Sequence, residues 1–137
     1  MYKGKIYFDI TTSIDLDIQA FREISHITPY DTKEKGKPVK LINGKVSPRI
    51  SPVNYQSYCI EVPSLEKVDE CIQLWVKNWG AYQRSLQKLS SLGCVMQLTI
   101  EMVISIENVP EMSIKNKHLK ILGECGIDLA FDIYEEP

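Results

Sequence analysis

Carboxylates recur at alternating positions in several stretches of this sequence, and they serve acid–base catalysis, divalent metal binding and recognition of basic partners. Near the end of the chain, Asp128 and Asp132 lie four residues apart within Ile127 to Tyr134. On a strand this spacing puts both carboxylates on one face but two steps apart, so they do not share an ion unaided. The sequence has no Asp-x-Asp-x-Asp or His-rich motif. We therefore predict a non-enzymatic protein without a metal or a cofactor.

Cysteine and histidine offer little further chemistry. None of the four cysteines is spaced as Cys-x-x-Cys, and the two histidines, His26 and His118, are far apart. Each cysteine stands among apolar neighbours, which favours small buried side chains in a reducing compartment over a zinc site or a reactive thiol. The cysteines are Cys59, Cys71, Cys94 and Cys125.

A basic segment interrupts the regular pattern between His26 and Asn54, where several prolines and glycines occur. We expect a long surface loop, with a short edge strand over Val39, Leu41 and Ile42 that turns at Asn43-Gly44. Its cations favour either a solvated, mobile loop or a site for phosphate or nucleic acid, although a glycine-rich phosphate motif is absent. The candidate residues are Lys33, Lys35, Lys37 and Lys40, followed by Lys45 and Arg49.

Length and charge narrow the class of protein. The chain has 137 residues, a net charge of −2 and a pI near 5.7. We expect a single α+β domain over residues 1–137, and the charge argues against a protein built mainly to hold nucleic acid. Neither a long apolar run nor a signal-like N-terminus is present, so we expect a cytoplasmic protein that does not insert into membranes.

A long amphipathic stretch from Ser64 to Leu92 organises these elements. Its apolar residues recur every three or four positions, which predicts a helix that covers the core, with Ser64 as N-cap and Gly93 as its end. A continuous helix of this length would span about 44 Å, so we expect a break near Gly80. The apolar face is made of Leu65, Val68, Ile72, Trp75, Trp79, Tyr82, Leu86 and Leu89.

Two-residue alternation predicts half-buried strands elsewhere, and shorter helical patterns separate them. A first short helix is expected to start at Ser13 or Asp15 and to end at Ile24, and a later one is expected from Ser113 to Cys125. The predicted strands are Lys5–Thr11, Tyr55–Val62, Cys94–Ile106 and Ile127–Tyr134, with a turn from Glu107 to Met112.

Each predicted strand has one apolar and one polar face, unlike the doubly covered strands of parallel sheets. We therefore predict a two-layer α+β sandwich, with a largely antiparallel sheet of four to five strands and all helices on one face. The open face either is simply solvated or binds a basic partner through carboxylates and tyrosines. The candidate partner-binding residues are Tyr7, Asp9, Glu61, Glu101, Asp128, Asp132 and Tyr134, with Tyr55 and Glu107 on the same face.

Four stretches carry a family resemblance: the opening Lys5-Ile6-Tyr7-Phe8-Asp9-Ile10-Thr11, the turns Ile27-Thr28-Pro29 and Lys35-Gly36, and the closing run from Leu122 to Tyr134. Together they resemble an uncharacterised bacterial family called domain of unknown function 4279. The resemblance spans nearly the whole chain, but its motifs are short. Tyr58 stands where the family often has tryptophan, and a long loop precedes Tyr55. The family brings no assigned activity or catalytic residue.

Small bacterial α+β domains of this kind are often encoded beside polymorphic or contact-dependent toxins and act as immunity proteins. By this analogy of context, we expect a protein-binding domain that neutralises a cognate toxin domain. Toxin nucleases are commonly basic, and an inhibitor would present carboxylates in place of phosphates. The alternatives are a small-ligand or nucleic-acid-binding domain that uses the basic segment, and a structural dimerisation domain; the chain itself is either a monomer or a homodimer.

Overall fold

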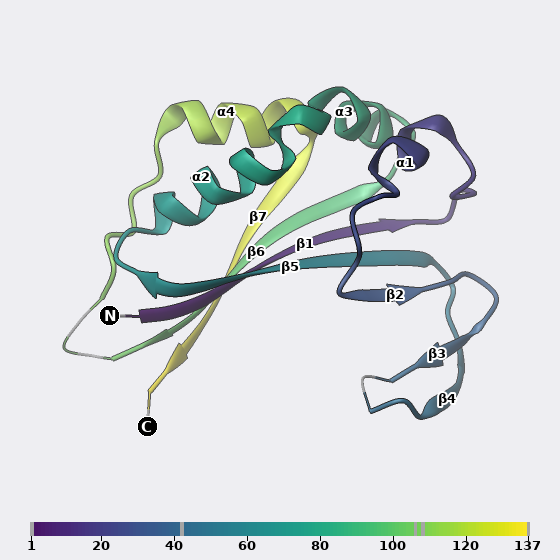
Figure 1. Cartoon of the computed structure of the whole chain (residues 1–137), viewed down its shortest axis with the longest axis horizontal. Coiled ribbons are helices and arrows are strands. Elements are labelled where there is room, and N and C mark those ends of the chain that lie inside the picture. Colours follow the sequence, from purple (N-terminus) through teal and green to yellow (C-terminus); the bar gives the residue numbers. More distant parts are fainter. Residues whose placement is uncertain (1, 42, 106, 108, 137) are drawn as a thin grey trace.

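The computed structural model describes residues 2–41, 43–105, 107 and 109–136, which form one sheet, a small two-stranded ribbon and a layer of helices (Figure 1). The sheet has five strands. In spatial order they are β2 (Asp31–Lys33), β5 (Asn54–Leu65), β1 (Tyr2–Thr12), β6 (Val95–Ile104) and β7 (Ile127–Glu135). The ribbon pairs β3 (Pro38–Lys40) with β4 (Val46–Ile50).

The helices lie on one face of the sheet, above it in Figure 1. They are α1 (Gln19–Ile24), α2 (Val68–Trp79), the 3-10 turn η1 (Gly80–Tyr82), α3 (Gln83–Ser91) and α4 (Asn116–Cys125). All strand pairs of the sheet are antiparallel except β6 with β7, which α4 connects as a crossover. The prediction of a two-layer α+β sandwich with a largely antiparallel sheet is confirmed.

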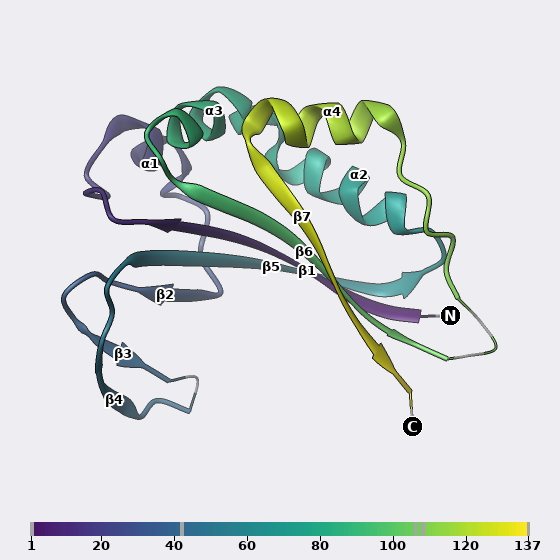
Figure 2. The same ribbon diagram turned by 180° about the vertical axis from the view of Figure 1, so that it is seen from behind.

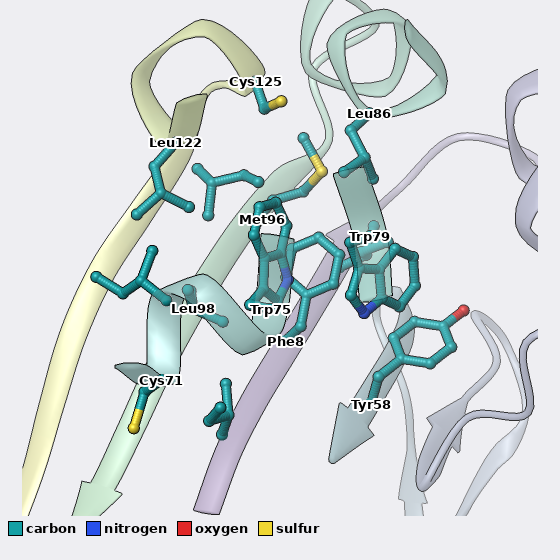
Figure 3. Packing of buried hydrophobic residues seen from close by; sticks show 14 of the residues in the cluster. Phe8, Tyr58, Cys71, Trp75, Trp79, Leu86, Met96, Leu98, Leu122 and Cys125 are labelled. Atoms are coloured by element: carbon teal, nitrogen blue, oxygen red, sulfur yellow. The ribbon is translucent and has the colours of Figure 1, made fainter. Parts of the chain in front are cut away.

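The alternation within β1 divides the molecule into its two layers. Ile6, Phe8 and Ile10 are buried beneath the helices, whereas the residues between them are only partly covered. Phe8 pairs with Tyr58 on one side and with Leu98 on the other, so that the apolar face continues across three strands. The rings of Trp75 and Trp79 from α2 then stand edge-on to Phe8, with centroids at 5.3 and 4.8 Å (Figure 3).

The long amphipathic stretch is broken where the sequence predicted a break. α2 ends at Trp79, the 3-10 turn starts at Gly80, and α3 continues from Gln83. Because the apolar spacing persists through the break, Trp75, Trp79, Leu86 and Leu89 all remain buried. The predicted start at Ser64 was wrong, because Ser64 and Leu65 are the last residues of β5. Leu65 pairs with Tyr2, and α2 begins only at Val68.

Other boundaries also differ from the sequence predictions. The first helix starts at Gln19 rather than at Ser13 or Asp15, because residues 13–18 form bends, one of which is closed by the Asp17 N–H and Asp15 Oδ1. The last helix starts at Asn116, and Ser113 instead bonds Glu111. The predicted long loop contains β2, β3 and β4. The expectations for Ile42, Ile106 and Asn108 lie outside the described residues.

Candidate functional site

The open face of the sheet brings together the seven candidate partner-binding residues, and Tyr55 lies on it with them. The register places Glu61, Lys5, Glu101 and Asp132 in one row across four strands. A second row contains Asp9 between Ser57 and Gln97, with Asp128 beside Gln97. Since residues that pair across strands point to the same face, Tyr7, Asp9, Glu61, Glu101, Asp128, Asp132 and Tyr134 share the face that faces away from the helices.

This open face is hollowed in two adjoining places. A hollow of about 740 Å³ is lined by Lys3, Lys5, Glu61, Glu101 and their neighbours on β1, β5 and β6. A smaller one of about 180 Å³ is lined by tyrosines and acids that include Tyr7, Asp9, Tyr55 and Asp132. Glu101 lines both hollows, and it therefore stands between the charged and the tyrosine-rich parts of the face.

The carboxylates of this face are held by tyrosine hydroxyls. The Tyr55 hydroxyl donates to Asp9 Oδ1 at 3.1 Å, and the Tyr134 hydroxyl donates to Asp132 Oδ2 at 2.9 Å. Within the described residues, the ion pairs shorter than 4.0 Å all involve other acids, namely Asp17, Glu34, Asp69 and Glu124. Lys3 and Lys5 line the larger hollow and Lys33 lies over Tyr55, so these cations reduce the negative charge of the face without forming an ion pair within 4.0 Å among the described residues.

Glu101 and Asp132 form a like-charged pair across β6 and β7. They are directly opposite in the parallel register, and like charges in this position destabilise a sheet. Lys5 is opposite Glu101 on the other side and opposite Glu61 on β5, so it offsets the charge of those two acids. Asp132 lies on the edge strand β7, and among the described residues β6 alone flanks it, with Glu101 rather than a cation opposite.

The tyrosines of the face keep their protons over the physiological range. Burial, and after it the nearby Glu101, raise the pKa of Tyr7 to about 12. The pKa of Tyr55 is raised by burial and by Asp9, and that of Tyr134 by its hydrogen bond to Asp132. Protonated phenols provide hydroxyl donors and apolar ring surface, and tyrosine is enriched at protein interfaces.

Most of the predicted basic candidates have partners of their own. Lys33 lies over the ring of Tyr55, with Nζ 4.9 Å from the centroid. Lys37 pairs with Glu34 at 3.0 Å, and Lys35 Nζ reaches the Ser13 carbonyl at 3.4 Å. Lys40 lies in the ribbon and is exposed. A hollow of about 460 Å³ next to Lys35 is lined by residues 13–16, 34–36 and Asn54.

The cysteines and histidines lie away from the open face, apart from Cys59. All four cysteines are free thiols, and burial raises the pKa of each. His118 is buried against Asp69, and His26 bonds the Tyr82 hydroxyl at 2.7 Å. In the part of the chain that the structure describes, groups of three or more His, Cys, Asp or Glu suited to a metal ion are not found.

The set of candidate partner-binding residues omitted several residues of this face, including Lys3, which lines the larger hollow, and Lys33, which pairs with Tyr55. Asp31 pairs with Ser57 through β2, Lys5 lies among the acids, and the ring of Tyr30 stands edge-on to Tyr7 at 6.1 Å. β2 has only three residues, which is too short for alternation to reveal. Lys5 could have been found, since its parity within the first strand is that of Tyr7. Glu107, in contrast, lies beyond the end of β6 and does not belong to the face.

Comparisons with protein-family models, curated proteins and solved structures give no match for this chain. The resemblance to domain of unknown function 4279 thus stays a prediction. Among the described residues, the helices are all too short or too polar to cross a membrane.

Proposed function

We propose that this chain is a non-enzymatic cytoplasmic domain that binds another protein through its open sheet face, as an immunity protein that neutralises a basic toxin domain. The observation that carries the proposal is the set of carboxylates on one uncovered, hollowed face, where acids outnumber the lysines and form no ion pair within 4.0 Å among the described residues. Such a face attracts a basic surface at long range and favours cationic side chains at contact.

The tyrosines support a protein partner over a small ion. Tyr7, Tyr55 and Tyr134 add ring surface and hydroxyl donors between the acids, and Tyr30 extends this surface beyond β5. Aromatic residues are enriched where proteins meet, and tyrosine supplies apolar area together with a hydrogen bond. A basic protein surface would satisfy the carboxylates and bury the rings in a single contact.

The decisive experiment combines co-expression with a change of charge on this face. The chain is produced with the product of the neighbouring gene, and we measure co-purification and relief of toxicity. The double variant Asp128→Lys and Asp132→Lys should lose both, while Glu66→Lys with Glu70→Lys, two exposed acids outside the open face, should keep them. Unchanged neutralisation by the first variant would exclude the open face as the binding surface.

The hollow beside Lys35 favours a second candidate function, binding of a small anionic ligand or of nucleic acid by the basic segment. Binding of this kind should weaken steeply with added salt, because cations that neutralise phosphates release counterions. The variant Lys35→Glu with Lys37→Glu should abolish it and leave the open face intact. Salt-insensitive binding of a phosphate-bearing ligand would argue against this function.

A further inference from the structure

β7 is an open edge of the main sheet. It has nine residues and, within the described chain, pairs only with β6. It crosses the front of the molecule in Figure 2 and extends well beyond the end of α4. The opposite edge is β2, which has three residues and offers little backbone for pairing.

The phase of the backbone hydrogen bonds identifies which groups of β7 point outward. The Glu136 N–H donates to the Ile104 carbonyl at 2.8 Å, so the even-numbered residues direct their backbone groups toward β6. In a parallel ladder alternate residues bond to the same neighbour, and the odd-numbered ones then point away from it. The outward-pointing backbone groups are those of Ile127, Leu129, Phe131, Ile133 and Glu135.

Apart from its acids Asp128, Asp132 and Glu135, which would admit a basic strand, this edge carries few of the usual features that prevent strand addition. Proteins protect long edges with Pro, Lys, short strands or bulges. The β7 sequence from Ile127 to Glu135 contains no Pro, Lys or Arg, and its register with β6 runs without a shift. Phe131 and Ile133 are 41% and 46% exposed, because the helix layer does not reach this part of the strand.

We propose that β7 receives an extended segment of the basic partner as an added strand, an inference that rests on the proposed function and specifies how the partner binds. The added strand would pair with the outward groups of Leu129, Phe131 and Ile133. Its residues on the open face would meet Asp128 and Asp132 and are therefore basic. Those on the other face would meet Phe131 and Ile133 and are therefore apolar.

A second copy of the chain is a poorer occupant of this edge. Pairing of two β7 strands would place Asp128 and Asp132 of each copy on neighbouring strands of the same face. Carboxylates in such positions repel each other, and Glu101 already lies opposite Asp132. A strand that alternates basic and apolar residues instead relieves this repulsion, so charge complementarity favours it.

The first test uses synthetic peptides and the intact protein. One peptide alternates Lys and Val over nine positions; the second has the same composition in blocks, and the third has the alternating sequence with every other backbone nitrogen methylated. We measure affinity and amide hydrogen exchange. The alternating peptide should slow exchange at Leu129, Phe131 and Ile133 by at least about tenfold, and the other two should bind about tenfold more weakly. Equal affinity of all three, or no protection of these amides, overturns strand addition.

Variants of β7 separate this inference from the proposed function. Ile133→Pro removes an outward N–H, and Asp132→Asn keeps the backbone while it removes charge from the open face. If Ile133→Pro keeps its circular dichroism spectrum and the peptide no longer protects its amides, strand addition is supported. If this variant misfolds, weaker binding of the methylated peptide to the natural chain provides the same support. Variants of the open-face acids Asp128 and Asp132 could abolish neutralisation of the toxin while Ile133→Pro and methylation of the peptide have no effect. That result would exclude strand addition and leave the proposed function supported. If these amides become protected when the protein concentration is raised without any peptide, the edge binds a second copy of the chain, and the proposal is overturned.

Discussion

Asp69 and His118 form a buried contact that joins α2 to α4, with Asp69 Oδ1 2.7 Å from His118 Nδ1. A carboxylate only accepts, so this nitrogen carries the proton. The same oxygen accepts the Lys115 N–H at 3.0 Å, at the residue that precedes the first turn of α4. One carboxylate therefore fixes both the start of α4 and its position against α2, and α4 in turn leads directly into β7.

Removal of this carboxylate should weaken the fold. We expect Asp69→Ala to lower the free energy of unfolding by about 3 kcal/mol, because a buried imidazole and a backbone N–H lose a charged acceptor. Urea denaturation followed by circular dichroism measures the change. Glu70→Ala is the matched control, since Glu70 is the exposed neighbour and should cost no more than about 0.5 kcal/mol. Equal losses in both variants would show that the contact contributes nothing.

The same contact predicts how stability depends on acid. Burial acts to raise the pKa of Asp69, but hydrogen bonds from His118 and Lys115 outweigh it, and the pKa lies below the usual 3.8. The unfolded state then binds more protons, so this stabilisation is complete above pH 3.8 and is lost as the pH falls through the lower folded-state pKa. Urea titrations from about pH 6 to about pH 2.5 should show a shallower acid decline in Asp69→Ala than in the natural chain.

Trp79 is a core residue whose loss should be costly. Its ring stands edge-on to Phe8 at 4.8 Å and to Tyr58 at 4.7 Å, and it is buried at the end of α2 (Figure 3). We expect Trp79→Ala to lower the free energy of unfolding by about 3–5 kcal/mol. Trp79→Phe keeps a ring and should cost clearly less. Thermal unfolding of both variants provides the comparison, and equal costs would contradict a specific packing role.

Gly126 should tolerate substitution less well than Gly36, although both have positive φ, of 69° and 82°. A Cβ at Gly126 would overlap Ser90 Oγ and approach Ser90 Cβ at 3.0 Å, whereas a Cβ at Gly36 would meet nothing within 4 Å. Gly36→Ala should therefore lower the free energy of unfolding by about 1 kcal/mol, which is the cost of the left-handed backbone alone. Gly126→Ala should cost at least about 1 kcal/mol more. Chemical denaturation of the two variants tests this difference, which should shrink when Ser90 is changed to Gly.

Neutralising Asp132 should stabilise the isolated chain. Asp132 faces Glu101 across β6 and β7, whereas Asp128 faces the neutral Gln97. We expect Asp132→Asn to raise the free energy of unfolding by about 0.2–1 kcal/mol, and Asp128→Asn to leave it nearly unchanged. The gain should diminish with added salt, because this exposed repulsion is screened. A loss of stability in Asp132→Asn would mean that its bond with Tyr134 outweighs the repulsion.

Alternation was sufficient to predict the layers and the open face. Residues such as Phe8 and Leu98 are apolar at every second position, and a two-residue period assigns each side chain to a face without knowledge of which strands are neighbours. The same parity placed Tyr7 and Asp132 on one face, even though they lie on strands that do not pair with each other.

The contacts that depend on distant partners were not predictable from local pattern. Leu65 ends a strand rather than starting a helix because it pairs with Tyr2. In the sequence, Asp69 has the position of an ordinary acid in the first turn of a helix, and its role appears only where α4 packs beside it. The short strand predicted at Val39 and the turn at Asn43-Gly44 correspond to β3 and the turn of the ribbon, but β2 and β4 were missed because they are only three and five residues long and lie among prolines. β6 and β7 are parallel because α4 connects them as a crossover, and the residue pattern of the two strands alone does not indicate their relative direction.

The central position of β1 also has a consequence for how the chain folds. Lys3 pairs with Val103, Thr11 with Val95, and the other side of the strand with residues of β5. During synthesis β1 therefore stays unpaired until β5 and β6 have been made. Folding that depends on pairing between residues far apart in the sequence is slow. We infer that nascent β1, with Ile6, Phe8 and Ile10 still uncovered, is the segment that chaperones have most reason to protect.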